Sequence, residues 1–451
     1  MRRSSRRTLL LSLGLPALLV VVQQQLLQRQ PPRLEQLRQA PASSGPAALQ
    51  VRFSRPMAAT DVAKDSRLHP PLRHRWLGKG SRLLLTLEEG QRIKEPLDLV
   101  LAGVDPRGLA LRSSRWRWDP RPMVLAVVQV PGGEQLQLRG HDGRWQPISP
   151  IWRAIPVMLP LGDGSAVAVA NQLDDGRLRL WLIPLRQDNP RQAEDRRSPL
   201  EVGRPMALAA EPVAFSHFSS NRRGDLLVQS GRLEADGSST TVRTADGRTH
   251  TLTLKPGGPI HLAPEGGAIL IPETQGISLQ TLPPSLGGSE PPRRQILPGS
   301  RDLSSFCPQA GRALLLRHWP DYRRSLELVE PGQAPRQLWL GDEALLASAC
   351  SRGGQRVWAL LLDGIVRPRL SVASFDAAGR LLERRNLTDW EAEPGAGLYW
   401  DPSTGQLLTV LRPLAATNSR QPARAVLIDA ERLSIQPLGL PVSQAQWLPG
   451  G

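Results

Sequence analysis

The chain has 451 residues, and 57 Lys and Arg against 41 Asp and Glu give a formal net charge of +16 at pH 7. A hydrophobic share of 40% supports a sizeable core and excludes a wholly disordered chain, while 43 Pro and 40 Gly argue against a helical bundle because both residues break helices. Two cysteines exclude a disulfide-dense scaffold and a zinc site built from several thiolates. The composition favours an all-β chain of short strands.

The first thirty residues have the pattern of an export segment. Four of the first seven residues are arginines, and an apolar run of 14 residues follows from Leu9 to Val22. This run is shorter than the roughly 20 residues that span a bilayer, although Leu26 and Leu27 extend it. Residues 1–30 are therefore either a cleaved signal peptide or a signal anchor, with residues 9–27 held in the inner membrane. Both alternatives predict an exported protein, periplasmic or at the cell surface.

Residues 31–47 are rich in Pro, Gln, Ala and Ser, which predicts a flexible linker. Beyond them the arginines are scattered in turn-like contexts, as at Arg323 and Arg324. Solvated loop charge is the simpler interpretation, and attraction to an anionic envelope polymer or membrane surface is the alternative. Nucleic acid is not expected as a partner, because the sequence has neither a basic helix nor an aromatic stacking motif.

Residues 48–121 contain several short strands at regular spacing, which predicts a small β-sandwich. The strands lie in residues 51–57, in residues 74–87, at the alternating Leu97, Leu99 and Leu101, and in the aromatic segment 114–118. The order of the FSRPM opening, the leucine strand, the Asp-Pro-Arg-Gly turn and the aromatic exit strand resembles the bacterial Ig-like domain of S-layer and other envelope proteins. That resemblance implies a spacer or adhesion module.

Residues 122–451 repeat one pattern, a polar or proline turn followed by a glycine and an apolar run. The anchor glycines are spaced by 60, 43, 44, 43 and 51 residues, and the longest step contains the polar segment 186–204, interpreted as a loop insertion. The anchors are Gly164, Gly224, Gly267, Gly311, Gly354 and Gly405. A period of 40–45 residues with three or four short strands is typical of β-propeller blades.

The two ends of this array predict how it closes. The chain stops after the turn half of the motif, and unassigned strands stand at the start of the array, in residues 124–148. We expect residues 442–451 to complete the first blade by pairing there, which makes seven blades. Eight is the alternative, if residues 76–121 form a blade and not a sandwich. The anchors around Gly267 and Gly405 resemble the Ser-Pro-Asp-Gly turn of TolB-like and WD40-like propellers, which implies a ligand- or protein-binding rim.

Candidate chemistry is sparse, and the sequence predicts no catalytic, cofactor-binding or metal-binding residue and no cofactor. The chain has neither the Gly-x-Ser-x-Gly elbow nor the phosphate-binding loop motif. The adjacent acids Asp174 and Asp175 would point to opposite faces of a strand, and Arg223-Gly224-Asp225 belongs to a repeat turn. Among the histidines, His217 and His261 occupy similar places before their anchors and are candidates for the central channel. The others are His69, His74, His141, His250 and His318.

Cys307 and Cys350 fall at equivalent positions of adjacent repeats, 43 residues apart. Equivalent strands of neighbouring blades are expected to hold the two Cα atoms beyond the 7 Å limit for a bridge, which favours two free buried thiols over a disulfide. Six tryptophans in or beside strands are expected to pack between blades, with a sugar-stacking platform as the alternative. They are Trp152, Trp319, Trp339, Trp358, Trp400 and Trp447.

Together these features predict an all-β chain with an N-terminal signal or anchor, an Ig-like sandwich and a seven-bladed propeller closed by its own ends. The expected function is that of a membrane-tethered envelope protein that is not an enzyme and binds a protein or glycan. Two alternatives remain open: an enzyme using the propeller channel, and a structural surface-layer component.

Overall fold

The computed structural model describes residues 29–450, except 43, 196–199, 232–237, 255–256, 289–292, 309–310, 365, 367 and 415–420. The chain divides into two compact units. The N-terminal unit holds residues up to 91 together with 95–119 and 190–196, and the C-terminal unit holds the remainder. The predicted export segment falls almost entirely on residues 1–28, outside the described part. Within the described part, no helix is long and apolar enough to cross a membrane.

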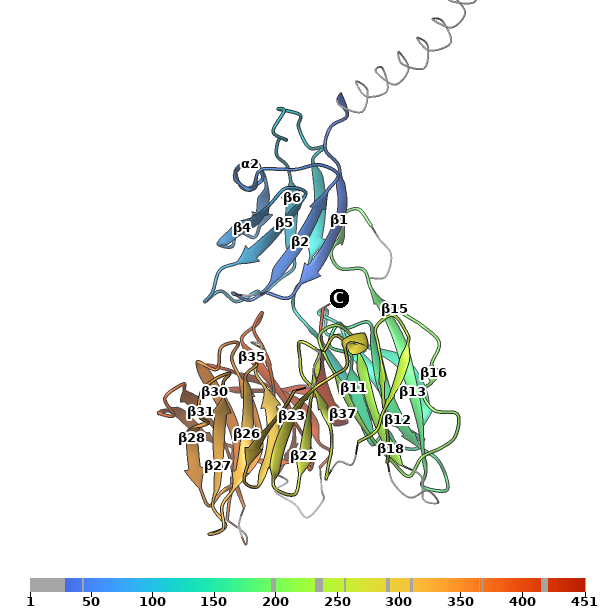
Figure 1. The fold of residues 1–451 in the computed structure, drawn as a ribbon, viewed down its shortest axis with the longest axis vertical. Coiled ribbons are helices and arrows are strands. Elements are labelled where there is room, and N and C mark those ends of the chain that lie inside the picture. The colour runs from blue at the N-terminus through green and yellow to red at the C-terminus, as the bar shows by residue number, and fades with distance from the viewer. Residues whose placement is uncertain are drawn as a thin grey trace, which may run out of the picture. The chain divides into compact units, whose positions relative to one another are not determined.

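The N-terminal unit consists of two four-stranded antiparallel sheets (Figure 1). One has the order β1 (Leu34–Ala40), β2 (Ala48–Phe53), β5 (Arg82–Leu87) and β4 (His74–Lys79). The other has the order β14 (Arg191–Gln192), β7 (Ser114–Trp118), β6 (Leu97–Leu101) and β3 (Arg67–His69). The alternating Leu97, Leu99 and Leu101 are all buried, so the period of two predicted for this strand is present. A short helix, α2 (Ala59–Asp65), follows β2.

Two parts of this unit differ from the expectation. Residues 34–40 of the predicted linker form β1, which pairs with β2 along its length. Its side chains are half-buried or exposed, so cross-strand hydrogen bonds and not an apolar pattern hold it in place. The predicted loop 186–204 contributes β14, which pairs with Trp116 and Arg117 of β7. The strands within residues 76–121, which would have formed an eighth blade, are β4 to β7 of this unit.

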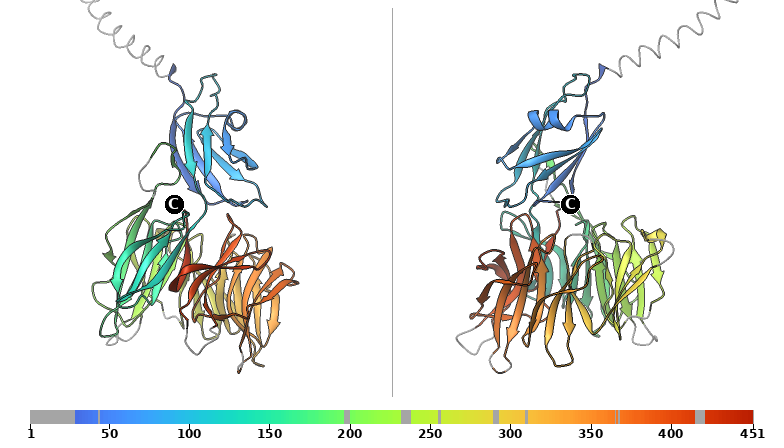
Figure 2. Two further views of the ribbon diagram at one scale, coloured as in Figure 1. Left: turned by 180° about the vertical axis from the view of Figure 1, so that it is seen from behind. Right: turned by 60° about the vertical axis from the view of Figure 1, so that its left-hand side comes forward.

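The C-terminal unit is a succession of antiparallel sheets that follow the chain (Figure 2). Its early strands are β8 (Met123–Val130), β9 (Gly133–Arg139), β10 (Trp145–Trp152), β11 (Val157–Pro160), β12 (Ala166–Gln172), β13 (Leu178–Gln187), β15 (Leu200–Val202), β16 (Met206–Ala207), β17 (Phe215–Ser220), β18 (Leu226–Gly231), β19 (Ser238–Arg243) and β20 (Thr249–Leu252). A middle group contains β21 (His261–Leu262), β22 (Ala268–Glu273), β23 (Gly276–Thr281), β24 (Arg294–Pro298), β25 (Arg301–Phe306), β26 (Ala313–His318), β27 (Arg324–Val329) and β28 (Arg336–Gly341). The last strands are β29 (Ala344–Cys350), β30 (Arg356–Asp363), β31 (Arg369–Asp376), β32 (Leu381–Asn386), β33 (Trp390–Ala392), β34 (Tyr399–Asp401), β35 (Gln406–Pro413), β36 (Arg424–Asp429) and β37 (Ile435–Leu448).

The six anchor glycines lie in equivalent turns, each between two paired strands. For the first five these are the first and second strands of a sheet, and Gly405 lies between β34 and β35 of the eight-stranded sheet. All six have a positive φ, between 69° and 84°. This left-handed conformation favours glycine because it has no Cβ. At Gly164 a Cβ would also lie only 2.4 Å from the carbonyl oxygen of Pro449. The repeat predicted from the sequence is therefore confirmed as a repeat of one turn.

The C-terminal strand pairs with the first strand of the unit, as predicted. Residues Val442 to Leu448 of β37 align antiparallel with Val128 to Met123 of β8. The earlier half of β37 pairs with β36, so this single 14-residue strand joins two groups of strands into one eight-stranded sheet. It also lies beside β11 (Figure 1). There the Gln446 Nε2 donates to the carbonyl oxygen of Met158 at 3.2 Å.

The core lies between neighbouring sheets. One apolar cluster combines Leu125 and Leu136 with Val167 and Ile183, and includes Leu448 near the end of the chain. Burial of a Leu, Ile or Val side chain contributes about 1.5–3 kcal/mol. Because each sheet buries both faces against its neighbours, the sheets depend on one another for stability.

Candidate functional site

One cavity in the C-terminal unit is formed by strands from all its parts. It has a volume of about 670 Å³ and is lined from β11, β17, β21, β25, β29, β34 and β37. Six of these are the strands that precede the anchor turns, and the seventh is the strand that pairs with β8. We call this space the central cavity. Its walls come from segments up to almost 290 residues apart, so it exists only when the whole unit is folded.

Aromatic side chains held in fixed positions form one side of the central cavity. The indole Nε1 of Trp447 donates to the carbonyl oxygen of Tyr399 at 2.9 Å. Trp400 stacks on Trp358 with ring centroids 5.7 Å apart and an interplanar angle of 25°. Burial raises the pKa of Tyr399 to about 12, so its phenol stays a neutral hydroxyl group. These contacts preorganise the aromatic faces for a ligand.

Serine hydroxyls line another part of the central cavity. Ser348 of β29 forms hydrogen bonds with two serines of the neighbouring β25, at 2.7 Å with Ser304 and 3.2 Å with Ser305. On β17, the Ser219 Oγ accepts a hydrogen bond from the Leu262 backbone N–H at 2.9 Å. A hydroxyl group has one donor and two acceptor sites, so this wall retains hydrogen-bonding capacity for a polar ligand.

The central cavity carries little charge, although the protein is strongly basic. Among the described residues that line it, Asp302 is the one charged side chain, and neither Lys nor Arg is present. Asp302 lies 2.8 Å from the Nε2 of His318. Because the described lining contains Asp302 and neither Lys nor Arg, it suits an uncharged ligand better than a polyanion.

His217 and His261 were both expected to face the central channel, and of the two His261 lines the central cavity whereas His217 does not. They lie on β17 and β21 with ring centroids 4.9 Å apart in an edge-to-face arrangement. Burial, and then the neighbouring His217, lowers the pKa of His261 to about 4. Burial also lowers the pKa of His217, whose Nε2 has no hydrogen-bond partner. Both rings are neutral at pH 7, and His261 faces the central cavity.

The remaining predicted candidates do not line the central cavity, although His318 contacts Asp302, which does. Arg223-Gly224-Asp225 forms a turn in which Asp225 accepts from the side-chain amide of Asn221 at 2.7 Å and from the Ala245 backbone N–H at 3.0 Å. Asp174 and Asp175 are exposed in the turn between β12 and β13. The other histidines are His69 in β3, His74 in β4, His141 after β9, His250 in β20 and His318 at the end of β26. The described residues contain no group of three side chains that could hold a metal ion.

The expectation of two free thiols is wrong. Cys307 and Cys350 form a disulfide with Cα atoms 5.3 Å apart, inside the limit that the sequence argument expected them to exceed. Cys307 directly follows β25 and Cys350 ends β29, the two first strands that pack against each other in adjacent sheets. The strands β25 and β29 approach each other closely at these ends. The 43-residue spacing of the two cysteines in the sequence does not reveal the distance between them in space.

The tryptophans differ in whether they pack only within the core or also line the central cavity. Trp358 is 2% exposed, and its indole donates to the carbonyl oxygen of Ala430 at 2.8 Å, so it packs between sheets as predicted. Trp152 and Trp339 also pack against apolar clusters. Trp400 and Trp447 have one face in such clusters and also line the central cavity. The serines of the cavity wall were missed, because nothing in their sequence context distinguishes them from other strand serines.

No family model matches the chain, and no curated protein does. Solved structures with a similar fold include TolB from Acinetobacter baumannii, at 10% identity and a TM-score of 0.41, covering 80% of this chain and 81% of that one. A protein of Bacteroides fragilis described as a 6-phosphogluconolactonase has 12% identity and a TM-score of 0.44, over 73% and 98% of the two chains. A prolyl endopeptidase has 10% identity and a TM-score of 0.48, over 79% and 49%. These values are too low to transfer a function.

The comparisons correct one prediction. The sequence predicted that the protein is not an enzyme, because it has no recognisable catalytic motif. A protein described as a 6-phosphogluconolactonase and a prolyl endopeptidase are among the structures with this propeller-like fold. The absence of a motif in such a fold therefore excludes no activity, and the prediction is withdrawn.

Proposed function

We propose that this is an exported envelope protein that binds a glycan segment in the central cavity. The observation that carries the proposal is the lining of that cavity. Fixed aromatic faces at Trp400 and Trp447 stand with serine hydroxyls in a space without a cationic side chain among its described residues. Aromatic rings stack on the apolar faces of sugars, and hydroxyl groups exchange hydrogen bonds with sugar hydroxyls.

Two features support export. The arginine-flanked apolar segment of residues 9–22 has the form of a signal or anchor. The Cys307–Cys350 disulfide fits an oxidising compartment, because such bonds are rare in the reducing cytosol. In this proposal the N-terminal segment targets or tethers the protein to the inner membrane, and the body faces the periplasm or the cell surface.

The proposed architecture follows from the strand order. The sheets of the C-terminal unit correspond to seven blades when the eight-stranded sheet is divided at β37, and each blade provides one strand to the central cavity. We interpret this unit as a seven-bladed propeller and the two sheets of the N-terminal unit as an Ig-like spacer. A protein partner bound by the loops is the other partner predicted from the sequence.

Glycan binding is tested with the purified full chain in a neutral detergent, by calorimetric titration with neutral oligosaccharides from envelope glycans. Trp400→Leu removes a stacking face and is expected to weaken binding about two- to tenfold, since a stacked aromatic pair contributes about 0.5–1.5 kcal/mol. Trp152→Leu is the matched control, because Trp152 packs on an apolar cluster but does not line the central cavity.

If the two variants bind the glycan with equal affinity, the central cavity is not the glycan-binding site. Binding of anionic oligosaccharides in preference to neutral ones would contradict the charge argument. Self-association of the chain without any glycan binding would favour the structural surface-layer alternative.

A further inference from the structure

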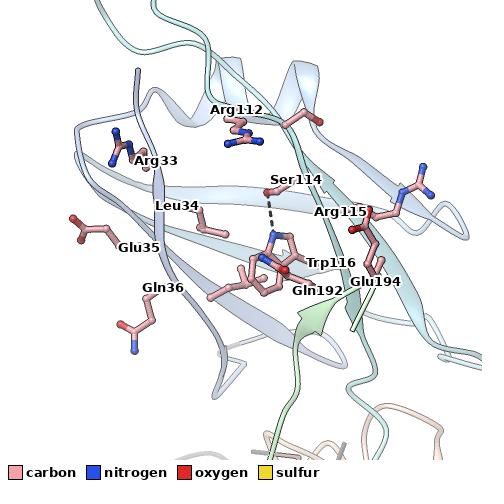
Figure 3. Close-up of a pocket in the computed structure, with 13 residues that line it drawn as sticks. Arg33, Leu34, Glu35, Gln36, Arg112, Ser114, Arg115, Trp116, Gln192 and Glu194 are labelled. Carbon is pink, nitrogen blue, oxygen red and sulfur yellow. Dashed lines mark hydrogen bonds between the residues drawn. The ribbon is translucent and has the colours of Figure 1, made fainter. Parts of the chain in front are cut away.

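A second cavity lies within the N-terminal unit, at the edges of its two sheets. It has a volume of about 640 Å³ and is lined by residues 33–37 at β1, residues 112–116 at β7 and residues 192–194 at β14 (Figure 3). β1 is the edge strand of one sheet, and β14 covers only two residues of β7 in the other. We call this space the edge pocket.

The edge pocket combines an apolar floor with a cationic margin. Leu34, Leu37 and Trp116 are half-buried, and the Trp116 Nε1 donates to the Ser114 Oγ at 3.0 Å, which fixes the indole. Figure 3 shows the side chains of Arg33 and Arg112 at the margin of this floor, whereas the side chain of Arg115 lies on the other side of β7 from Trp116. All three arginines are exposed.

These three arginines differ from the turn arginines elsewhere in the chain. Arg177 and Arg323 each pair with an aspartate two residues earlier, at 2.6 and 2.7 Å. The three arginines of the edge pocket have no ion pair within the described part of the chain. Of the two glutamates nearby, Glu35 pairs with Arg52 at 3.0 Å. The margin of the pocket therefore keeps excess positive charge, which complements an anionic group.

The position of the pocket in the chain indicates which anionic group is near. Arg33 follows the apolar run by 11 residues, a separation of at most about 40 Å in an extended chain. If residues 9–22 enter the inner membrane, the pocket lies close to lipid headgroups. Each arginine near an anionic membrane surface makes the free energy of binding to that surface more favourable. Guanidinium groups bind phosphate oxygens in a bidentate manner.

A strand-adding peptide fits less well, because part of the β7 edge is already paired. Arg191 and Gln192 align with Arg117 and Trp116, and the Ala193 backbone N–H donates to the Arg115 carbonyl oxygen at 3.1 Å. We propose that the edge pocket binds the headgroup of an anionic phospholipid, with Arg33 and Arg112 on its phosphate, Arg115 adding positive charge nearby, and the Leu and Trp side chains against its glycerol and upper acyl chain. This inference rests on the proposed export and membrane tether, and is independent of glycan binding.

The test uses the full chain in mixed micelles of a neutral detergent. Phosphatidylglycerol and phosphatidylcholine, each with the same fluorescent acyl chain, are titrated separately. We expect phosphatidylglycerol to bind at least tenfold more tightly. The triple variant Arg33→Gln, Arg112→Gln and Arg115→Gln is expected to abolish this preference, and thermal unfolding checks that it keeps the fold.

The matched control is the triple variant Arg75→Gln, Arg144→Gln and Arg248→Gln, which removes the same charge from exposed sites away from the edge pocket. It is expected to keep the preference for phosphatidylglycerol. Equal affinity for the two lipids, or an equal loss in both triple variants, would overturn the proposal. Soluble glycerol phosphate or an acidic peptide that binds as tightly as phosphatidylglycerol would assign the pocket to that ligand instead. Since the assay measures neither export nor glycan binding, its failure is distinguishable from failure of the proposed function.

Discussion

The imidazole of His261 links the stability of the C-terminal unit to pH. Its pKa is about 4 in the folded protein, against 6.5 for an unperturbed histidine, because burial and then His217 disfavour its charged form. The unfolded state therefore binds more protons between these two values. Stability contributed by the neutral ring is complete above about pH 6.5 and is lost as the pH falls towards 4.

We expect the free energy of unfolding to fall by roughly 2 kcal/mol between pH 7.5 and pH 4.5 through this histidine, at 1.36 kcal/mol for each pKa unit and with an allowance for partial exposure. His261→Gln should remove most of this decrease. Urea denaturation at the two pH values measures it, and His141→Gln, which removes an exposed ring, is the control. An unchanged pH dependence in His261→Gln would show that this ring is not the titrating group. The carboxylates with lowered pKa values, such as Asp246 at about 2, act only below this window.

Individual residues of the site could be predicted only where they belonged to a local sequence pattern. His217 and His261 were both expected to face the central channel because they hold similar positions before successive anchors, but His261 lines the central cavity and His217 does not. Trp400 and Trp447 were assigned to strands, but a two-residue period does not tell which strand face meets the central cavity. Ser304 and Ser348 carry no signal, because their hydrogen bond joins residues 44 apart.

At the scale of elements, the most local signals were the most reliable. The six anchor glycines were found because each one needs a left-handed backbone conformation in its own turn. In contrast, β1, α2 and β14 were missed. α2 has seven residues and no side-chain cap, and β14 is held by pairing with β7, about 75 residues earlier in the chain. Such long-range pairing leaves no period in the sequence.

The disulfide joins two elements, β25 and β29, and its contribution can be measured. Cys307 and Cys350 are 43 residues apart, and a bridge across a loop of this size stabilises a protein by about 2–4 kcal/mol. We expect the double variant Cys307→Ala and Cys350→Ala to lower the free energy of unfolding by that amount. Alanine is the suitable replacement, since both side chains are buried and a serine hydroxyl would need a new partner.

Chemical denaturation of the wild type with and without reductant provides the control. Reductant should destabilise the wild type by a similar amount and leave the double variant unchanged. If the wild type is equally stable with and without reductant, the disulfide does not stabilise the protein by restricting its unfolded chain.

At the scale of the whole molecule, the pairing of β37 with β8 determines whether the C-terminal unit behaves as one cooperative structure. This pairing was predicted because the turn at the end of the chain lacks the strand that follows every other anchor, and the first strands of the array lack a partner. The separation of more than 300 residues did not hide it, since both ends were visibly incomplete. The cavity lining depends on the same pairing, because Gln446 and Trp447 contribute to the wall from β37.

Nested truncations test this dependence. Deletion of residues 442–451 removes six strand partners of β8 together with Val442 and Leu448, both 0% exposed. Those two side chains alone contribute about 3–6 kcal/mol, a large part of the 5–15 kcal/mol that stabilises a typical domain. We therefore expect the truncated chain to lose its cooperative unfolding transition in calorimetry. Deletion of residues 449–451 is the control, since it keeps the β37 ladder and removes the hydrogen bond from Gln187 Nε2 to the Pro449 carbonyl oxygen, at a cost of about 1 kcal/mol. If both truncations shift the melting temperature equally, the ends of the array fold independently of each other, and the central cavity cannot depend on their pairing.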